Sequence, residues 1–108
     1  HKSHLIYLLF FCAFSPKNGQ AQNGKLDSLF AELKSIPTNT DTAQIHRRAH
    51  LLWRISTHYF RPMKAYDKSR QYGRESLRLY QQLQNTRGVA QSLGNIAFSH
   101  LYESHSPE

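Results

Sequence analysis

The pentapeptide HRRAH, residues 46–50, carries the residue types and spacing closest to a catalytic metal motif. His46 and His50 lie four residues apart, so a helix would place both imidazoles on one face, as in the zinc motif of metalloproteases. That motif also needs a glutamate directly after the first histidine to activate water, and Arg47 stands there instead. Two neighbouring arginines would also repel a divalent cation. We therefore expect no metal site.

The rest of the chain carries no pattern that is typical of an enzyme. The sequence has no glycine-rich phosphate loop, no paired carboxylates with a cleft to hold them and no serine or cysteine nucleophile beside a base. We expect neither enzymatic activity nor a cofactor.

Residues 1–21 have the pattern of a secretory signal peptide. Lys2 precedes the apolar run LIYLLFFCAF (5–14), and Pro16 and small residues up to Ala21 follow it. This run is too short to cross a bilayer, because a membrane-spanning helix needs about 20 apolar residues. We predict cleavage after Ala21 and export of the mature chain. A retained anchor or a buried core helix is the alternative.

Positive charge is concentrated in the second half of the chain. The formal net charge is +7, and residues 47–87 hold ten Lys and Arg against Asp67 and Glu75. On a helix, Arg70, Arg74 and Arg78 would form a stripe along the outer face, and such a stripe can bind phosphates. The alternative function is therefore a basic module for anionic lipid head groups or nucleic acid. An exported chain rarely meets nucleic acid, so we expect no nucleic-acid partner.

Hydrophobic periodicity predicts an all-α chain. The stretch 25–36 repeats apolar residues at helical spacing and ends at Pro37, which leaves residues 22–42 as one amphipathic helix with a linker. Three further helices are predicted at about 43–60, 64–83 and 86–102. Pro62 should end the first of these, Thr40 or Asp41 should cap its start, and Thr86 should cap the last.

Two of the predicted helices match each other at an offset of 41 residues. Internal repetition at such a period is typical of stacked helical units. The matched residues would share one helical face, and small residues there would let neighbouring helices approach closely. The matches are Ala49, Leu52, Ile55 and Ser56 with Ala90, Leu93, Ile96 and Ala97, and the further small positions are Ser69, Gly73 and Ser76.

From residue 49 onward the chain resembles tetratricopeptide (TPR) repeats. The first unit matches at Leu52, Ile55, Ser56, Tyr59, Ser69, Gly73 and Ser76, and the second at Leu93, Ile96 and Ala97. Gly73 and His100 depart from the family pattern, the closing proline is absent, and the offset exceeds the usual ~34 residues. The longer offset is similar to the exported TPR sensor regions of bacterial histidine kinases and related regulators.

The resemblance implies antiparallel helical hairpins over residues 43–108, about one and a half repeats, with the second cut short. It also implies a periplasmic or cell-envelope scaffold that binds a protein or peptide along a concave groove, with membrane association through a downstream segment and a role in signal transduction. Gly94 would leave room for the partner, and Arg61 and Asn95 would contact its carboxylates. The alternatives are that Gly94 stands at a position that tolerates change and that Trp53 and Phe60 are core aromatics. The groove residues that the family pattern gives are His50, Trp53, Thr57, Phe60, Arg61, Gln91, Gly94, Asn95, Phe98 and Tyr102.

Overall fold

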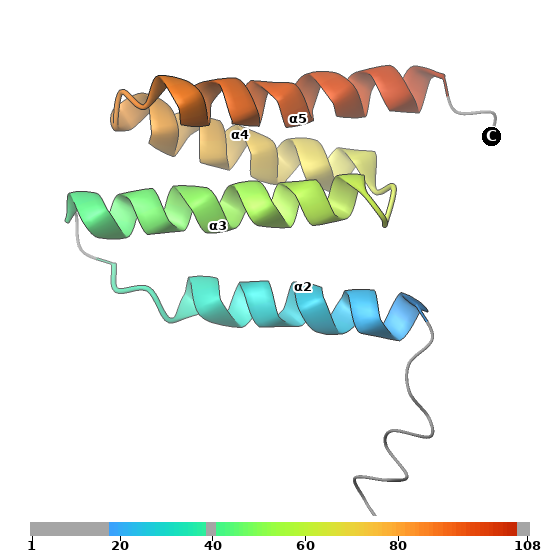
Figure 1. Cartoon of the computed structure of the whole chain (residues 1–108), viewed down its shortest axis with the longest axis horizontal. Coiled ribbons are helices and arrows are strands. Elements are labelled where there is room, and N and C mark those ends of the chain that lie inside the picture. The colour runs from blue at the N-terminus through green and yellow to red at the C-terminus, as the bar shows by residue number, and fades with distance from the viewer. Residues whose placement is uncertain (1–17, 39–40, 106–108) are drawn as a thin grey trace, which may run out of the picture.

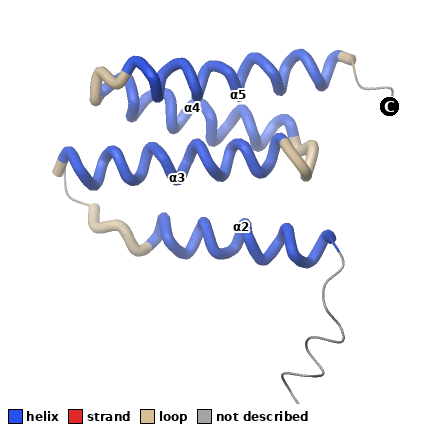
Figure 2. Tube along the Cα trace, viewed as in Figure 1, coloured by secondary structure: helices blue, strands red, loops and turns tan. Residues whose placement is uncertain are grey.

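The computed structural model describes residues 18–38 and 41–105, and these residues form four helices. The helices are α2 (Asn18–Lys34), α3 (Thr42–Phe60), α4 (Tyr66–Gln82) and α5 (Thr86–Ser104). Each runs antiparallel to the one before it, so α3 and α5 point the same way, with α4 behind them (Figure 1). Short connections join α3 to α4 and α4 to α5 (Figure 2). The predicted all-α fold is confirmed. None of the described helices is long and apolar enough to span a bilayer.

The helix ends follow local chemistry, with two corrections. Asp41 caps α3, because its side chain accepts a hydrogen bond from the backbone N–H of Ala43 at 3.1 Å. The cap of α5 is Asn85 and not the predicted Thr86, since the Asn85 side chain accepts from the N–H of Gly88 at 2.9 Å. The other correction concerns α2, which begins at Asn18, ahead of the apolar repeat that predicted it.

The predicted signal peptide lies largely outside the described residues. Residues 1–17 are not described, and residues 18–21 form the start of α2.

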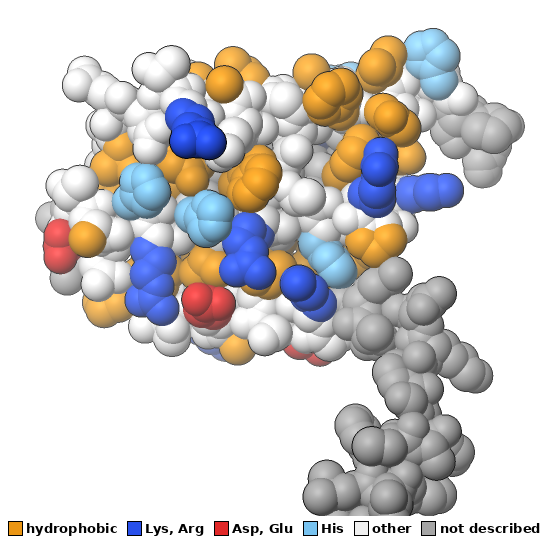
Figure 3. All heavy atoms as spheres, in the orientation of Figure 1, with side chains coloured by type: hydrophobic (Ala, Val, Ile, Leu, Met, Phe, Trp, Pro, Cys, Tyr) orange, Lys and Arg blue, Asp and Glu red, His pale blue; other side chains and the backbone are white. Residues whose placement is uncertain are grey.

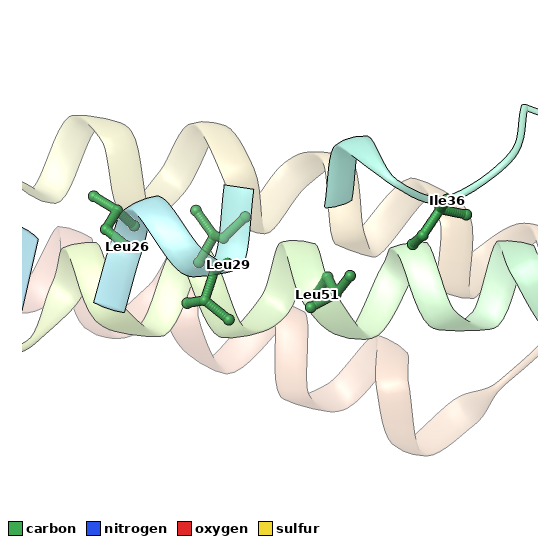
Figure 4. Packing of buried hydrophobic residues seen from close by; sticks show 5 residues of the cluster. Leu26, Leu29, Ile36 and Leu51 are labelled. Atoms are coloured by element: carbon green, nitrogen blue, oxygen red, sulfur yellow. The ribbon is translucent and has the colours of Figure 1, made fainter. Parts of the chain in front are cut away.

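The apolar face of α2 packs on α3 and forms the first part of the core. Leu26 and Leu29, both predicted on that face, are buried against Leu51 and Ile55 of α3. Figure 4 shows Leu26, Leu29 and Ile36 spread along α3, with Leu51 between Leu29 and Ile36. Arg48 of α3 holds the segment that follows α2, because its guanidinium donates to the carbonyl of Pro37 at 3.2 Å. Burial of this apolar surface holds α2 to the other helices.

Small residues let α3 and α4 cross at close range, as predicted. The hydroxyl of Ser56 donates to the carbonyl of Ser69 at 2.7 Å, and the hydroxyl of Ser69 donates to the carbonyl of Ser56 at 2.9 Å. Both serines are fully buried, as is Ser76, whose hydroxyl donates to the carbonyl of Ala49 at 2.9 Å. These reciprocal bonds satisfy buried hydroxyls that would otherwise be costly. An alanine at Gly73 would place its Cβ 3.2 Å from Ser56 Oγ.

The equivalent face of α5 is exposed. Ala97 is solvent-exposed, so its predicted role as a packing position is wrong. The physical reason is that α5 turns Gly88, Ser92 and Ser99 inward, while no other described helix covers the side that holds Ala97. The large apolar side chains left partly open are Leu93 (49 % exposed), Phe98 (53 %), Leu101 (49 %) and Tyr102 (44 %).

Candidate partner-binding surface

Helices α3 and α5 touch along a line of contacts from Ser56 and Thr57 to Phe60, which we call the seam. It brings together residues that the sequence predicted as a groove. The amide of Asn95 on α5 donates to Thr57 Oγ1 at 2.9 Å and to Ser56 Oγ at 3.2 Å on α3. About one turn further along α3 and two turns further along α5, the rings of Phe60 and Tyr102 meet edge to face, with centroids 5.1 Å apart. These contacts join positions about forty residues apart in the chain and fix α3 against α5.

Several residues predicted to contact a partner instead make contacts within the chain. Asn95 was expected to contact a partner's carboxylate, but both its amide donors are used on α3 hydroxyls. The guanidinium of Arg61, expected to do the same, is exposed and lies 5.6 Å from the centre of the Phe60 ring. Phe98 is largely exposed, Gln91 is half-buried, and a Cβ added at Gly94 would meet nothing within 4 Å. Gly94 therefore does border open space.

The two histidines of HRRAH make aromatic contacts. The ring of His46 stands edge-on to Tyr80, with centroids 5.8 Å apart, and the ring of His50 stacks on Trp53 at 5.7 Å. Burial, followed by the nearby charge of Arg54 and His46, lowers the pKa of His50 below its ordinary value. In the part of the chain that the structure describes, no group of three or more His, Cys, Asp or Glu could hold a metal ion.

The seam opens into a cavity of about 600 Å³ at the carboxyl ends of α3 and α5. Its walls are aromatic and basic, because Phe60 packs edge to face against Tyr66 as well as Tyr102 and two cations border it. The lining residues are Phe60, Arg61, Pro62, Lys64, Tyr66, Tyr102 and His105.

A second cavity, of about 280 Å³, lies between α2 and α3. Its wall includes Trp53, Thr57 and Arg61, which the sequence predicted for a groove shared with the second repeat, and Lys25 and Arg54, which it did not predict. The signal was present, because Arg47, Arg54 and Arg61 recur every seven residues along α3. The lining residues are Lys25, Leu29, Trp53, Arg54, Thr57, His58 and Arg61.

The predicted stripe of exposed arginines on α4 does not include Arg70. Arg70 is buried, with 8 % of its surface exposed, so its placement on the outer face is wrong. Its guanidinium lies 2.6 Å from Asp67 and 2.8 Å from Glu103 of α5. The cause is the docking of α5, which covers Arg70 and supplies a carboxylate, while Arg74 and Arg78 stay exposed.

Arg70 should therefore contribute to stability, and Arg74 should not. We expect Arg70→Gln to lower the free energy of unfolding by about 1–2 kcal/mol, because it removes a buried, charge-assisted contact between α4 and α5. Arg74→Gln, the same change one turn away on the exposed surface, should stay within about 0.5 kcal/mol of the parent. Urea unfolding followed by far-UV circular dichroism measures both. Equal effects would show that Arg70 is not held by α5.

Comparisons of the chain with protein-family models, with curated proteins and with solved structures find no match. The seam, the two cavities and the charges around them are therefore the observations that bear on function.

Proposed function

We propose that this chain is an exported helical-repeat scaffold of TPR type, which binds a protein or peptide along the surface formed by α3 and α5. The observation that carries the proposal is the seam itself. Thr57 and Phe60 from α3 contact Asn95 and Tyr102 from α5, and the seam ends in a cavity large enough for a side chain.

The packing of the helices supports the repeat assignment. The α3 face that carries Ala49, Leu52 and Ser56 is buried by α4 through serine contacts. The 41-residue repeat places Ala90, Leu93 and Ala97 at the matching positions of α5, where all three are exposed, so the packing supports the assignment in the first unit only. In a helical array, parallel first helices present one continuous surface to a partner. A sensor role in signal transduction, on the periplasmic side of the cell envelope, fits a binding scaffold of this kind.

The alternative, a basic module for lipid head groups or nucleic acid, is weaker on this geometry. It depended on three aligned arginines, and Arg70 is turned inward and paired with Asp67 and Glu103. Arg74 and Arg78 remain for such a role. We infer no metal, no cofactor and no catalysis at the seam.

Peptide selection with residue-level mapping tests the proposal. A peptide selected from a random library against the chain should perturb amide resonances of α3 and α5, with Trp53, Thr57 and Phe98 among those affected. Most of its affinity should remain between 50 and 200 mM salt, whereas phosphate-dominated binding would fall about a thousand-fold or more. Perturbations centred on Arg74 and Arg78 with steep salt loss would favour the anion module. Failure to select any peptide would overturn the proposal.

A further inference from the structure

Helix α3 is covered on three of its four sides. Ser56 faces α4, Ile55 faces α2, and Thr57 faces α5, as their hydrogen bonds and burial show. At about 100° per residue, these contacts leave one side of α3, opposite α4, that no other described helix covers. The residues on that side are Arg47, His50, Arg54, His58 and Arg61.

This side of α3 forms the wall of a continuous basic groove. Arg61 lines both the cavity between α2 and α3 and the cavity at the end of the seam, so the two adjoin at its side chain. Figure 3 shows Lys, Arg and His side chains gathered across the face that α2, α3 and α5 form. We call the two cavities together the basic groove.

The charges that line the basic groove have one sign. Lys25, Arg54, Arg61 and Lys64 line it, and no Asp or Glu is among its lining residues. Glu32 of α2 lies 3.9 Å from Arg47 on the same side of α3, and neither of these two residues lines the two cavities. Cations on a concave wall reinforce one another's field and attract anionic groups.

The groove also ends in an apolar anchor site. Tyr66 and Tyr102 stand edge-on around Phe60, at 5.9 and 5.1 Å, and Arg61 closes one side. The rings contact one another, so they form walls for a side chain and do not stand apart as platforms on which nucleic-acid bases stack. An apolar side chain next to carboxylates fits such a site best.

The spacing of the cations sets the form of the ligand. Seven residues separate Arg54 of α3 from Arg61, the residue that caps its carboxyl end, which is roughly 10.5 Å along the helix axis. A chain in polyproline II conformation repeats its side-chain direction every three residues, over roughly 9.3 Å. Acidic residues at every third position would therefore reach successive cations.

We propose that the basic groove binds an extended acidic peptide, with its carboxylates at Lys25, Arg54 and Arg61 and an apolar side chain in the Phe60 cavity. This inference rests on the proposed function and names the chemistry of the partner. It moves the anion-recognising site from the predicted stripe on α4 to the uncovered side of α3.

Trp53 gives a direct readout, because it is the only tryptophan in the chain and lines the groove. The probe is a short peptide with glutamate at every third position and phenylalanine at one end. A matched peptide carries glutamine in place of each glutamate. Titration of the full chain with the glutamate peptide should change Trp53 emission and saturate, and the glutamine peptide should bind at least about ten-fold more weakly, which is 1.4 kcal/mol.

A pair of double variants separates the groove from net charge. Arg54→Gln with Arg61→Gln and Arg74→Gln with Arg78→Gln each remove two positive charges, the first pair in the groove and the second on exposed α4. We expect at least about ten-fold weaker binding for the first pair and less than about two-fold change for the second. If the first pair unfolds, Tyr102→Ala, against Leu93→Ala on the same helix, tests the anchor site.

The outcomes distinguish this inference from the proposed function. Equal binding of the two peptides would contradict the inference that the ligand is acidic, but it would still support a groove that binds peptides. Binding of neither would contradict both. Equal losses in the two double variants would mean that net charge, and not the groove, attracts the peptide. Tighter binding of an oligo-dT strand or of phosphatidylglycerol vesicles, with Trp53 responding, would assign the groove to those ligands instead.

Discussion

Replacing Ile55 with alanine is expected to destabilise the chain by about 2–5 kcal/mol, the largest single effect we predict. Ile55 is fully buried and packs with Leu26 and Leu29 of α2, while Tyr72 of α4 lies against the same cluster. The alanine would leave a cavity where three helices meet, and close-packed neighbours fill such a space only in part. Urea unfolding followed by circular dichroism measures the loss.

Two controls give the expected loss a scale. Ile55→Val removes one methylene from the same site and should cost about 0.5–1.5 kcal/mol. Leu93→Ala removes a side chain of similar size from α5, where Leu93 is 49 % exposed, and should cost about 1 kcal/mol or less. A cost for Leu93→Ala as large as that for Ile55→Ala would contradict the open face of α5 and mean that something covers it in solution.

The second large effect on the free energy of unfolding is expected when a glycine of α5 is replaced by alanine. Gly88→Ala would drive a Cβ into the ring of Tyr80, and Tyr80 is 2 % exposed and bordered by His46. The ring has no room to move away, so we expect a net loss of about 1–3 kcal/mol through overpacking. The φ angle of Gly88 is not positive, so the reason for the glycine is space and not backbone conformation.

Gly94→Ala is the matched change and should act in the opposite direction. An added Cβ meets nothing within 4 Å there, and alanine is favoured over glycine inside a helix by about 0.5–1 kcal/mol. The two variants should therefore move the urea midpoint apart, Gly88→Ala to lower and Gly94→Ala to higher concentration. If both stabilised the chain, Tyr80 would not lie over α5 as described. If Gly94→Ala also weakened binding of a selected peptide, Gly94 would border the bound partner.

Local sequence determined the helices of this chain and most of their ends. Asp41, Pro37 and Pro62 act on the backbone within a residue or two, so their effects can be predicted without a fold. The buried small residues Ser56 and Ser69 were also predictable, because helical spacing put Ser56 on the apolar face of its helix and Ser69 on the inner side of the next. That inference needed only periodicity.

The tertiary structure decided which faces have neighbours. Arg70, Arg74 and Arg78 lie on one side of α4 by spacing, yet of the three only Arg70 is covered by α5, because it lies nearest the face that α5 buries and Glu103 reaches it. Arg54 and Arg61 recur on α3 with the same regularity as the buried residues, but that side is left uncovered by α2, α4 and α5. Helical periodicity fixes which residues share a face. How many helices pack against that face depends on contacts between residues far apart in the chain, and a pattern within one helix carries no information about them.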